Sequence, residues 1–423
     1  MEPFHSLPEF VTLEHQVQTI LTQQEQHGWH FDTDAARQFA LALTSELREI
    51  EETLRRRHPF VDGGEWTPKR NNSRQGYVEG ASLCRLKETN PSSRDHQAWI
   101  LQQFYGWKPS QLTATGKCVI DETVLKDINS EMSLVFLRIL TITKMLGMIS
   151  QGANAYLKLV TNENRIHHHC SVATNTHRCA HRNPNLGQVP SDERFRRLFL
   201  PSPGQVMVGA DLSGIELRLL AHYLARYDGG RYAKILLEDD IHQVNADKIG
   251  ISRRQVKTVT YAFLYGAGDV KIGLSYDPQL SAADAKRKGK DIRAAYVDAV
   301  DGLGELLDAV QKTAEKGSIK AIDGRKIKVD STHKALNYLL QSSAGVIAKR
   351  WMVIVHNHIK QLGICASQLC FLHDELQYEC APEHTNDLRT SLVHSALQTG
   401  EYYNLRIRID AEAGEGSNWS ETH

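Results

Sequence analysis

Apolar positions in the first third of the chain recur at helical spacing. The pattern predicts two helices between about residues 13 and 57, with a break near Gly28. Residues 58–89 contain several glycines and asparagines and little periodicity, so we expect a long connection without regular structure there. Helical spacing returns over about 90–156. The first third is therefore expected to form an extended helical unit.

The pattern changes after this unit. Short apolar or alternating runs at 165–172 and 205–210 predict strands, and the second run leads directly into Asp211. Helical signals dominate from about 240 to 311. Near the end, two apolar runs flank His373-Asp374-Glu375, which is typical of a tight hairpin with a polar tip. The chain is thus expected to be a helix-rich α+β protein.

Composition narrows the class of protein but not its function. The chain has 423 residues, 41% hydrophobic and 24% charged, as in ordinary soluble globular proteins. Lys+Arg and Asp+Glu both total 50, so a nucleic-acid partner would require positive charge to be segregated locally. The most apolar stretch, 134–149, is interrupted by Arg138 and Lys144, so we expect no membrane span.

The cysteines and histidines give no clear metal signal. Seven scattered cysteines suit a reducing compartment rather than a disulfide framework or a zinc knuckle. In His167-His168-His169-Cys170, consecutive strand residues point to alternate faces, so we expect ordinary strand residues rather than metal ligands. Cys365, Cys370 and Cys380 are interpreted as core or strand residues.

Two acidic strand ends and one helix carry the candidate chemistry. Asp211 and Asp374 each follow an apolar strand, although either alone could simply cap a turn. In 253–266, two cations and two tyrosines recur every four residues and form one helical stripe. Such a stripe could hold a triphosphate at one end and a sugar and base at the other. For an isolated helix, a solvated face running into core tyrosines remains an equal alternative.

The order of these segments resembles a known family. Asp211-Leu212-Ser213-Gly214-Ile215-Glu216-Leu217-Arg218, the 253–266 helix and His373-Asp374-Glu375 resemble motifs A, B and C of the family A, polymerase-I-like DNA polymerases. The variants are most similar to those of replicative polymerases from T-odd coliphage-type podoviruses. Further similar segments lie at 90–96, 183–190, 333–341 and 416–419, so the resemblance covers the chain from about residue 9 to the end.

The resemblance implies a right-hand polymerase fold with an antiparallel-sheet palm, helical fingers and a helical thumb. The expected divisions are an N-terminal stub (1–9), the thumb (10–157, with a short insertion at about 58–89), a first palm segment (158–225), the fingers (226–337) and a second palm segment (338–423).

The resemblance also implies a metal centre. Asp211 and Asp374 would hold two Mg²⁺ ions, with Mn²⁺ as a substitute, and the main-chain carbonyl of Leu212 would join them. Glu375 would be a supporting carboxylate of the catalytic group, and His373 a turn-shaping residue or primer contact.

For the nucleotide, the resemblance implies that Arg253, Lys257 and His242 hold the triphosphate, with Lys257 also acting in catalysis. An ordinary helix-start histidine is the alternative for His242. Glu216 and Tyr261 would close the space beneath the sugar and exclude ribose. The Tyr261 hydroxyl would also weaken rejection of dideoxynucleotides.

For DNA, the resemblance implies that Tyr265 stacks near the templating position and that Arg178 reaches the minor groove. Asn337 and Gln341, four residues apart, would make similar contacts, with a helix-packing amide as the alternative. Arg325 would contact backbone phosphates.

The expected function is template-directed, DNA-dependent extension of a primer 3′ end with dNTPs, in viral DNA replication within the host cytoplasm. No 3′–5′ exonuclease activity is expected. Partners would be primer–template DNA, a separate exonuclease polypeptide and a replicative helicase–primase. Thioredoxin binding is not carried over, because 58–89 is short where coliphage-type relatives have a long insertion.

Two alternatives remain open. A single-subunit phage-type RNA polymerase shares the carboxylates and the cationic helix, but Glu216 argues against it. A catalytically idle DNA-binding subunit is disfavoured by the joint presence of Asp211, Asp374 and Lys257.

Overall fold

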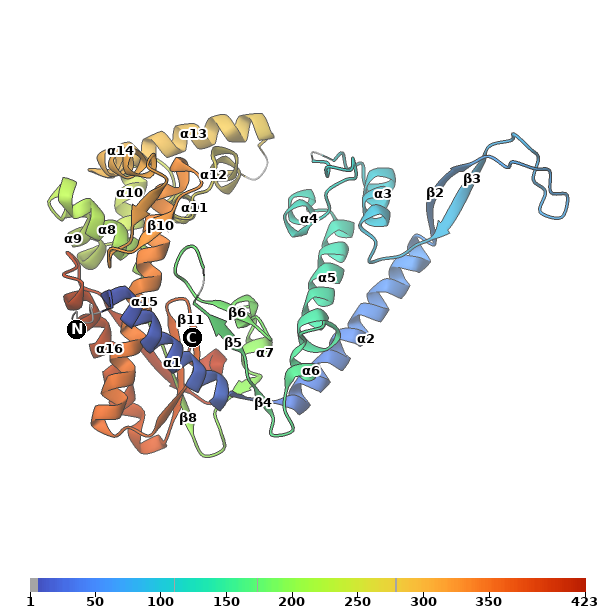
Figure 1. Ribbon diagram of the computed structural model, residues 1–423. Coiled ribbons are helices and arrows are strands. Elements are labelled where there is room, and N and C mark those ends of the chain that lie inside the picture. Colours follow the sequence, from blue (N-terminus) through green and yellow to red (C-terminus); the bar gives the residue numbers. More distant parts are fainter. Residues whose placement is uncertain (1–6, 110, 173, 278–279) are drawn as a thin grey trace, which may run out of the picture. The chain divides into compact units, whose positions relative to one another are not determined.

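The computed structural model describes residues 7–109, 111–172, 174–277 and 280–423, which are drawn in colour in Figure 1. The chain divides into two compact units. The larger unit comprises Met1–Thr33 and Leu159–His423, and the smaller unit comprises Asp34–Lys158.

The smaller unit is mainly helical. Its elements are α2 (Thr33–Arg57), β2 (Phe60–Trp66), β3 (Leu83–Glu88), α3 (Arg94–Tyr105), α4 (Glu122–Ile128), α5 (Glu131–Leu146), the π-helical turn η1 (Gly147–Gln151) and α6 (Tyr156–Leu159). Side chains such as Leu101, Leu125 and Phe136 form its core. The ends of these helices are defined locally, since Ser93 and Ser130 cap α3 and α5 through their hydroxyls.

The segment 58–89 differs from the expected irregular connection. β2 and β3 pair antiparallel, and the Trp66 ring packs against Tyr77 at 4.8 Å between centroids and beneath the Arg85 guanidinium at 4.4 Å. Most residues of both strands are at least partly exposed, so no buried face imposes alternation of apolar and polar residues. The sequence pattern therefore could not reveal this hairpin.

One helix of the smaller unit is unusually apolar. The stretch Glu131–Leu159 is long and apolar enough to cross a membrane by length and composition, which by itself is weak evidence. Its side chains Phe136 and Ile139 are buried in the core of the smaller unit, and Arg138 pairs with Glu46 at 2.5 Å. We therefore interpret it as a core helix.

A four-stranded antiparallel sheet organises the larger unit. Its strands, in the order β11-β12-β8-β13, are Ala366–Leu372, Glu375–Cys380, Val206–Leu212 and Ala411–Gly416. Helix α1 (Glu9–His27) packs on β11, helix α16 (Thr385–Tyr402) packs on β8 and β13, and helix α15 (Ala335–Leu362) packs against both α1 and α16 (Figure 1). The C-terminal end of β8 and the turn between β11 and β12 therefore lie at the same end of the sheet.

The larger unit also contains three smaller groups of strands. They are β4-β1-β7 (Arg165–Ile166, Trp29–Phe31, Phe199–Leu200), the pair β5 and β6 (His169–Ser171, Ala180–Arg182), and the pair β9 and β10 (Ser318–Lys320, Lys326–Lys328).

The remaining helices follow the chain from α7 to α14. They are α7 (Glu193–Arg196), α8 (Ile215–Asp228), α9 (Arg231–Glu238), α10 (Ile241–Ile249), α11 (Arg253–Leu264), α12 (Asp269–Tyr276), α13 (Ala282–Ala299) and α14 (Leu303–Ala314). Short 3-10 turns lie at Leu186–Gln188, Thr332–Lys334, Pro382–His384 and Trp419–Glu421. Helices α12 and α13 can pack closely because Gly273 and Gly289 have no Cβ. A Cβ at either position would collide with a main-chain carbonyl of the opposite helix.

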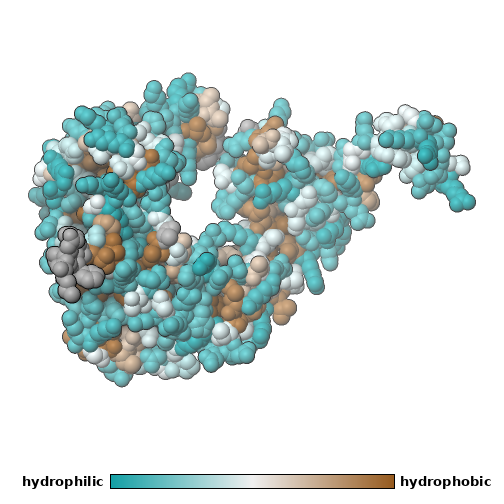
Figure 2. All heavy atoms as spheres, in the orientation of Figure 1, coloured by the Kyte–Doolittle hydropathy of each residue, from teal (hydrophilic) through white to brown (hydrophobic). Residues whose placement is uncertain are grey.

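Helix α1 differs from the expected division of the chain. The sequence placed residues 10–157 in one thumb, whereas α1 belongs to the larger unit. Its buried residues Leu13, Val17 and Leu21 join the core that contains α15 and β12. The apolar face of α1 therefore completes the sheet unit. On the visible face of the molecule, hydrophilic residues predominate and hydrophobic ones form scattered patches (Figure 2).

Candidate active site

The two acidic strand ends meet at one edge of the sheet. Asp211 on β8 pairs in register with Glu375, the first residue of β12, and the Leu212 amide donates to the main-chain oxygen of Asp374 at 3.0 Å. The turn between β11 and β12 consists of His373 and Asp374, and His373 adopts a φ of 59°, as primed two-residue hairpins require. The sheet therefore delivers both carboxylates to the same place.

The pKa values of both carboxylates lie above that of an ordinary aspartate. Burial, followed by the nearby Glu375 charge, raises the pKa of Asp211 to about 7. Burial, followed by the charge of Glu216, raises the pKa of Asp374 to about 6. Carboxylate oxygens are the ligands that Mg²⁺ prefers, and a divalent cation would relieve this repulsion. The residues present therefore fit a magnesium centre.

Glu375 is held differently from the two aspartates. It is 3% exposed, and its Oε1 accepts hydrogen bonds from Trp419 Nε1 at 2.6 Å and Gln377 Nε2 at 2.8 Å. Burial opposes its ionisation, but the hydrogen bond and charge of His423 and the bonds from Trp419 and Gln377 outweigh burial, so the pKa of Glu375 is lowered. A carboxylate whose ionised form is stabilised by these partners suits a supporting role.

His423 and Trp419 also lie at the site, although no sequence motif assigned a role to either residue. His423 Nδ1 lies 3.2 Å from Glu375 Oε2 and 3.6 Å from Asp211 Oδ2. One ligand atom each from Asp211, Glu375 and His423 fall within 4.8 Å of one another. The resemblance at 416–419 signalled that this segment matters, but only the fold shows that it reaches the carboxylates.

Glu216 links three elements beside this centre. It lies in the first turn of α8, where its Oε1 accepts from Arg178 Nη2 at 2.8 Å and from the Tyr265 hydroxyl at 3.2 Å. Burial and then the charges of Glu216 and Asp374 raise the pKa of Tyr261. Glu216, Tyr261, Tyr265 and Arg178 are therefore neighbours of the Asp374 carboxylate, as a sugar-binding and DNA-binding group would need to be.

The cationic residues lie at the start of α11, which Ser252 and Gln255 cap through a capping box. Arg253 Nε donates to Asp240 Oδ2 at 2.5 Å, and Lys257 is exposed one turn later. His242 is 8% exposed, lies 6.1 Å from the Tyr261 ring between centroids, and has its pKa lowered by burial. Its Nδ1 is buried without a hydrogen-bond partner among the described residues. An anionic ligand could engage all three side chains.

Three other residues that were predicted to contact DNA, Arg325, Asn337 and Gln341, are partly or fully buried. Arg325 is 7% exposed and pairs with Asp323 at 2.7 Å and with Glu14, so the structure does not present it to phosphates. Asn337 donates to the Leu264 main-chain oxygen at 2.6 Å and so fastens the end of α11 to α15, which is the helix-packing alternative. Gln341 is half-buried one turn further along α15.

Comparison with known proteins gives the family. The model of DNA polymerase family A matches residues 72–421. The chain belongs to DNA polymerase family A. It is similar to the DNA-directed DNA polymerases of Enterobacteria phage T3 (31% identity) and Escherichia phage T7 (30%), in both cases over 98% of this chain and 70% of the relative. The predicted family and enzyme class are thereby confirmed.

A solved structure supports the fold of this family A polymerase. The POL domain of Pol1 from M. smegmatis, in complex with DNA primer-template and dNTP, matches with a TM-score of 0.76. The match covers 97% of this chain and 70% of that chain at 23% identity. The α+β fold expected from the sequence is confirmed.

Proposed function

We propose that this family A polymerase extends the 3′ end of a DNA primer with dNTPs, as directed by a DNA template, through a two-metal mechanism. The observation that carries the proposal is the meeting of Asp211 and Asp374 at one sheet edge, both with raised pKa values. These carboxylates and the Leu212 carbonyl would hold two Mg²⁺ ions, or Mn²⁺ as a substitute. When bound, such ions lower the pKa of the primer hydroxyl and neutralise the triphosphate and pyrophosphate.

The protein side chains then bind and orient the nucleotide. Lys257 and Arg253 face the triphosphate, with Arg253 exchanging its Asp240 partner for phosphate oxygens. His242 donates from its unpartnered nitrogen to the same group. Positive charge here is most valuable as the leaving group becomes charged, so Lys257 also lowers the barrier.

Sugar selection rests on Glu216 and Tyr261. A ribose 2′-hydroxyl would meet these side chains and either clash or leave a buried polar group unpaired. This discrimination favours a DNA polymerase over the phage-type RNA polymerase alternative. The Tyr261 hydroxyl also compensates for a missing 3′-hydroxyl, so dideoxynucleotides are accepted.

Contacts to DNA would come from Arg178, Tyr265 and His373, which lie around the same centre. Arg178 reaches universal acceptors in the minor groove, and Tyr265 stacks near the templating base once it leaves Glu216. We retain Gln341 as a minor-groove contact and assign Asn337 mainly to fastening α11. The M. smegmatis relative, solved with primer-template and dNTP, supports these ligand classes.

The phage relatives support a role in viral DNA replication inside the host cytoplasm. We further propose that the chain does not degrade DNA ends itself and works with a separate exonuclease polypeptide and a replicative helicase–primase.

Primer extension tests the proposal. Wild type with Mg²⁺ and four dNTPs should extend a primed template, Asp374→Asn should not, and the exposed control Asp298→Asn should match wild type. A labelled single-stranded 3′ end should remain intact, and ribonucleotides should be used poorly. Extension that survives in Asp374→Asn would refute the metal assignment. DNA binding without any extension by wild type would instead favour an idle DNA-binding subunit.

A further inference from the structure

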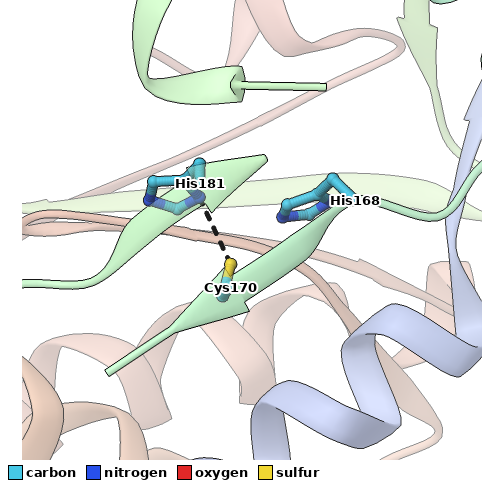
Figure 3. Close-up of side chains that lie close together, drawn as sticks. All are labelled: His168, Cys170 and His181. Carbon is cyan, nitrogen blue, oxygen red and sulfur yellow. Dashed lines mark hydrogen bonds between the residues drawn. The ribbon is translucent and has the colours of Figure 1, made fainter. Parts of the chain in front are cut away.

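A second group of possible metal ligands lies outside the candidate active site. Cys170 on β5 and His181 on β6 are register partners, and His168 precedes Cys170 by two residues on the same face (Figure 3). One ring nitrogen of each histidine and the Cys170 sulfur all lie within 4.8 Å of one another. His167 and His169 are directed instead to the main-chain oxygen and carboxylate of Glu25. Consecutive residues of the run 167–170 do point to opposite faces, as expected. His168 and Cys170, two residues apart, nevertheless share one face and meet His181 of the neighbouring strand.

A second sulfur lies beside this group of three. Cys370 on β11 has its sulfur 3.8 Å from His168 Nε2, and Cys170 Sγ lies 3.2 Å from His181 Nδ1. Tetrahedral zinc sites with nitrogen at about 2.0–2.1 Å and sulfur at about 2.3 Å have ligand atoms roughly 3.5 Å apart. All four side chains are buried, with exposures of 1%, 2%, 8% and 1% for His168, Cys170, His181 and Cys370. The spacing of the three mutually close ligand atoms thus suits a buried zinc site, with Cys370 beside His168 as the candidate fourth ligand.

The hydrogen bonds around the histidines show which nitrogen of each ring carries a lone pair within the group. Gln24 Nε2 lies 3.1 Å from His168 Nε2 and 3.6 Å from Cys170 Sγ, and Gln24 Oε1 accepts from Gln368. The Gln24 amide therefore donates to His168 Nε2, which leaves the proton of that ring on Nδ1, and a zinc ion bound to Nε2 would replace this hydrogen bond. The Cys170 thiol likewise faces His181 Nδ1. The other ring nitrogens, His168 Nδ1 and His181 Nε2, are buried without hydrogen-bond partners among the described residues.

We propose that His168, Cys170, His181 and Cys370 form a structural binding site for one zinc ion. Two neutral imidazoles and two thiolates neutralise the charge of Zn²⁺, which a fully buried site requires. Burial lowers the pKa of His168 to about 3 and of His181 to about 4, so both rings are neutral and able to ligate. Burial raises the pKa of Cys170 to about 12, so this thiol loses its proton only when the metal binds.

The site would tie three strands together next to the catalytic turn. β11 continues directly into His373 and Asp374, and the His181 ring lies edge-on to His373 at 6.2 Å between centroids. A zinc ion shared by Cys370 and the β5–β6 pair would hold the turn at 373–374 in place without contacting substrate. The zinc site does not depend on the proposed polymerase reaction.

Cobalt substitution tests the site in the full chain. The protein is stripped with a chelator, desalted and titrated with Co²⁺ in excess Mg²⁺, which occupies the Asp211 centre. We expect one equivalent of Co²⁺ to produce tetrahedral d–d absorption and a thiolate-to-cobalt charge-transfer band, both abolished by one equivalent of Zn²⁺. The thiolate band distinguishes this site from the carboxylate centre, which has no sulfur. Wild type without a thiolate band would overturn the proposal and leave a hydrogen-bonded core cluster.

Variants sharpen the assignment. Cys170→Ser and His181→Gln should lower Co²⁺ affinity by more than the ~10–100-fold that loss of an outer-shell partner costs. The neighbours His169→Gln and Cys380→Ser, which lie outside the four ligands, should keep both bands. Circular dichroism and melting curves establish that each variant folds, and the wild-type titration stands even where a variant does not. Unchanged affinity in folded Cys170→Ser would also overturn the proposal.

Discussion

Replacing Asp211 with asparagine should abolish primer extension and at the same time stabilise the metal-free protein. Asparagine has nearly the same shape but carries no charge. The wild-type carboxylate is repelled by Glu375 and is partly desolvated, and only part of this is offset by His423. Removing the charge therefore removes an unfavourable feature of the folded state that a bound cation would otherwise offset.

The size of the effect follows from the pKa of Asp211, which is raised from 3.8 to about 7. At about 1.4 kcal/mol per pKa unit, the upper limit is about 4 kcal/mol. The side chain is 39% exposed, so solvent screening reduces the expected gain to about 1–2 kcal/mol. Because the folded pKa is raised, the wild type loses this stability as pH rises from 3.8 towards 7. The gain from Asp211→Asn should therefore be small near the lower value and complete above the higher one.

Urea denaturation in EDTA at about pH 5 and about pH 8 measures this gain. We expect Asp211→Asn to be more stable than wild type at about pH 8, with a smaller difference at about pH 5. Added Mg²⁺ should stabilise the wild type and narrow the gap. The exposed control Asp298→Asn should stay within about 0.5 kcal/mol of wild type at both pH values. A gain that is absent, or equal at both pH values, would refute the assignment of Asp211 as a strained, cation-seeking carboxylate.

Three further changes test other regions of the site. Glu216→Ala should raise the ratio of ribonucleotide to deoxyribonucleotide insertion by about tenfold or more, measured by single-nucleotide kinetics, and an unchanged ratio would exclude a sugar filter there. Tyr261→Phe should reject dideoxynucleotides about 100-fold more strongly, whereas equal chain termination would show that its hydroxyl does not assist them. Gly209→Ala should lower stability by about 1–3 kcal/mol, because its Cβ would collide with the Gln377 side chain and the Thr422 carbonyl. A normal melting temperature for that variant would contradict the packing of the C-terminal segment on β8.

The sequence predicted features whose signals are local. The strand ending in Asp211, the hairpin carrying Asp374 and the amphipathic helix with Lys257 all follow from short periodic runs with clear boundaries. That these three segments meet at one site was predicted from the order of the motifs along the chain and from the family resemblance. Strands β8 and β12 are buried on both faces, and their antiparallel pairing places Asp211 opposite Glu375 and next to Asp374.

Features that depend on distant contacts could not be predicted. Arg325 has the pattern of a surface cation, but its partner Glu14 is 311 residues away in sequence. His423 reaches Glu375 only because the last strand, β13, pairs with β8. Convergence of His168 with Cys370 likewise requires β11 to lie against the β5–β6 pair. In each case the sequence shows which side chain is present, but only the tertiary fold determines which group that side chain contacts.

The β2–β3 hairpin also has a consequence for engineering. Its connecting residues, between Trp66 and Leu83, are largely exposed, and a local bridge between Asn72 and Tyr77 closes the tip. Lengthening such a loop costs only about 0.6 kcal/mol for each doubling, so a whole binding module could be inserted there while the core around Phe136 stays intact. A DNA-binding module inserted in this loop could therefore hold the polymerase on its template. The sheet that carries Asp211 and Asp374 would be unchanged.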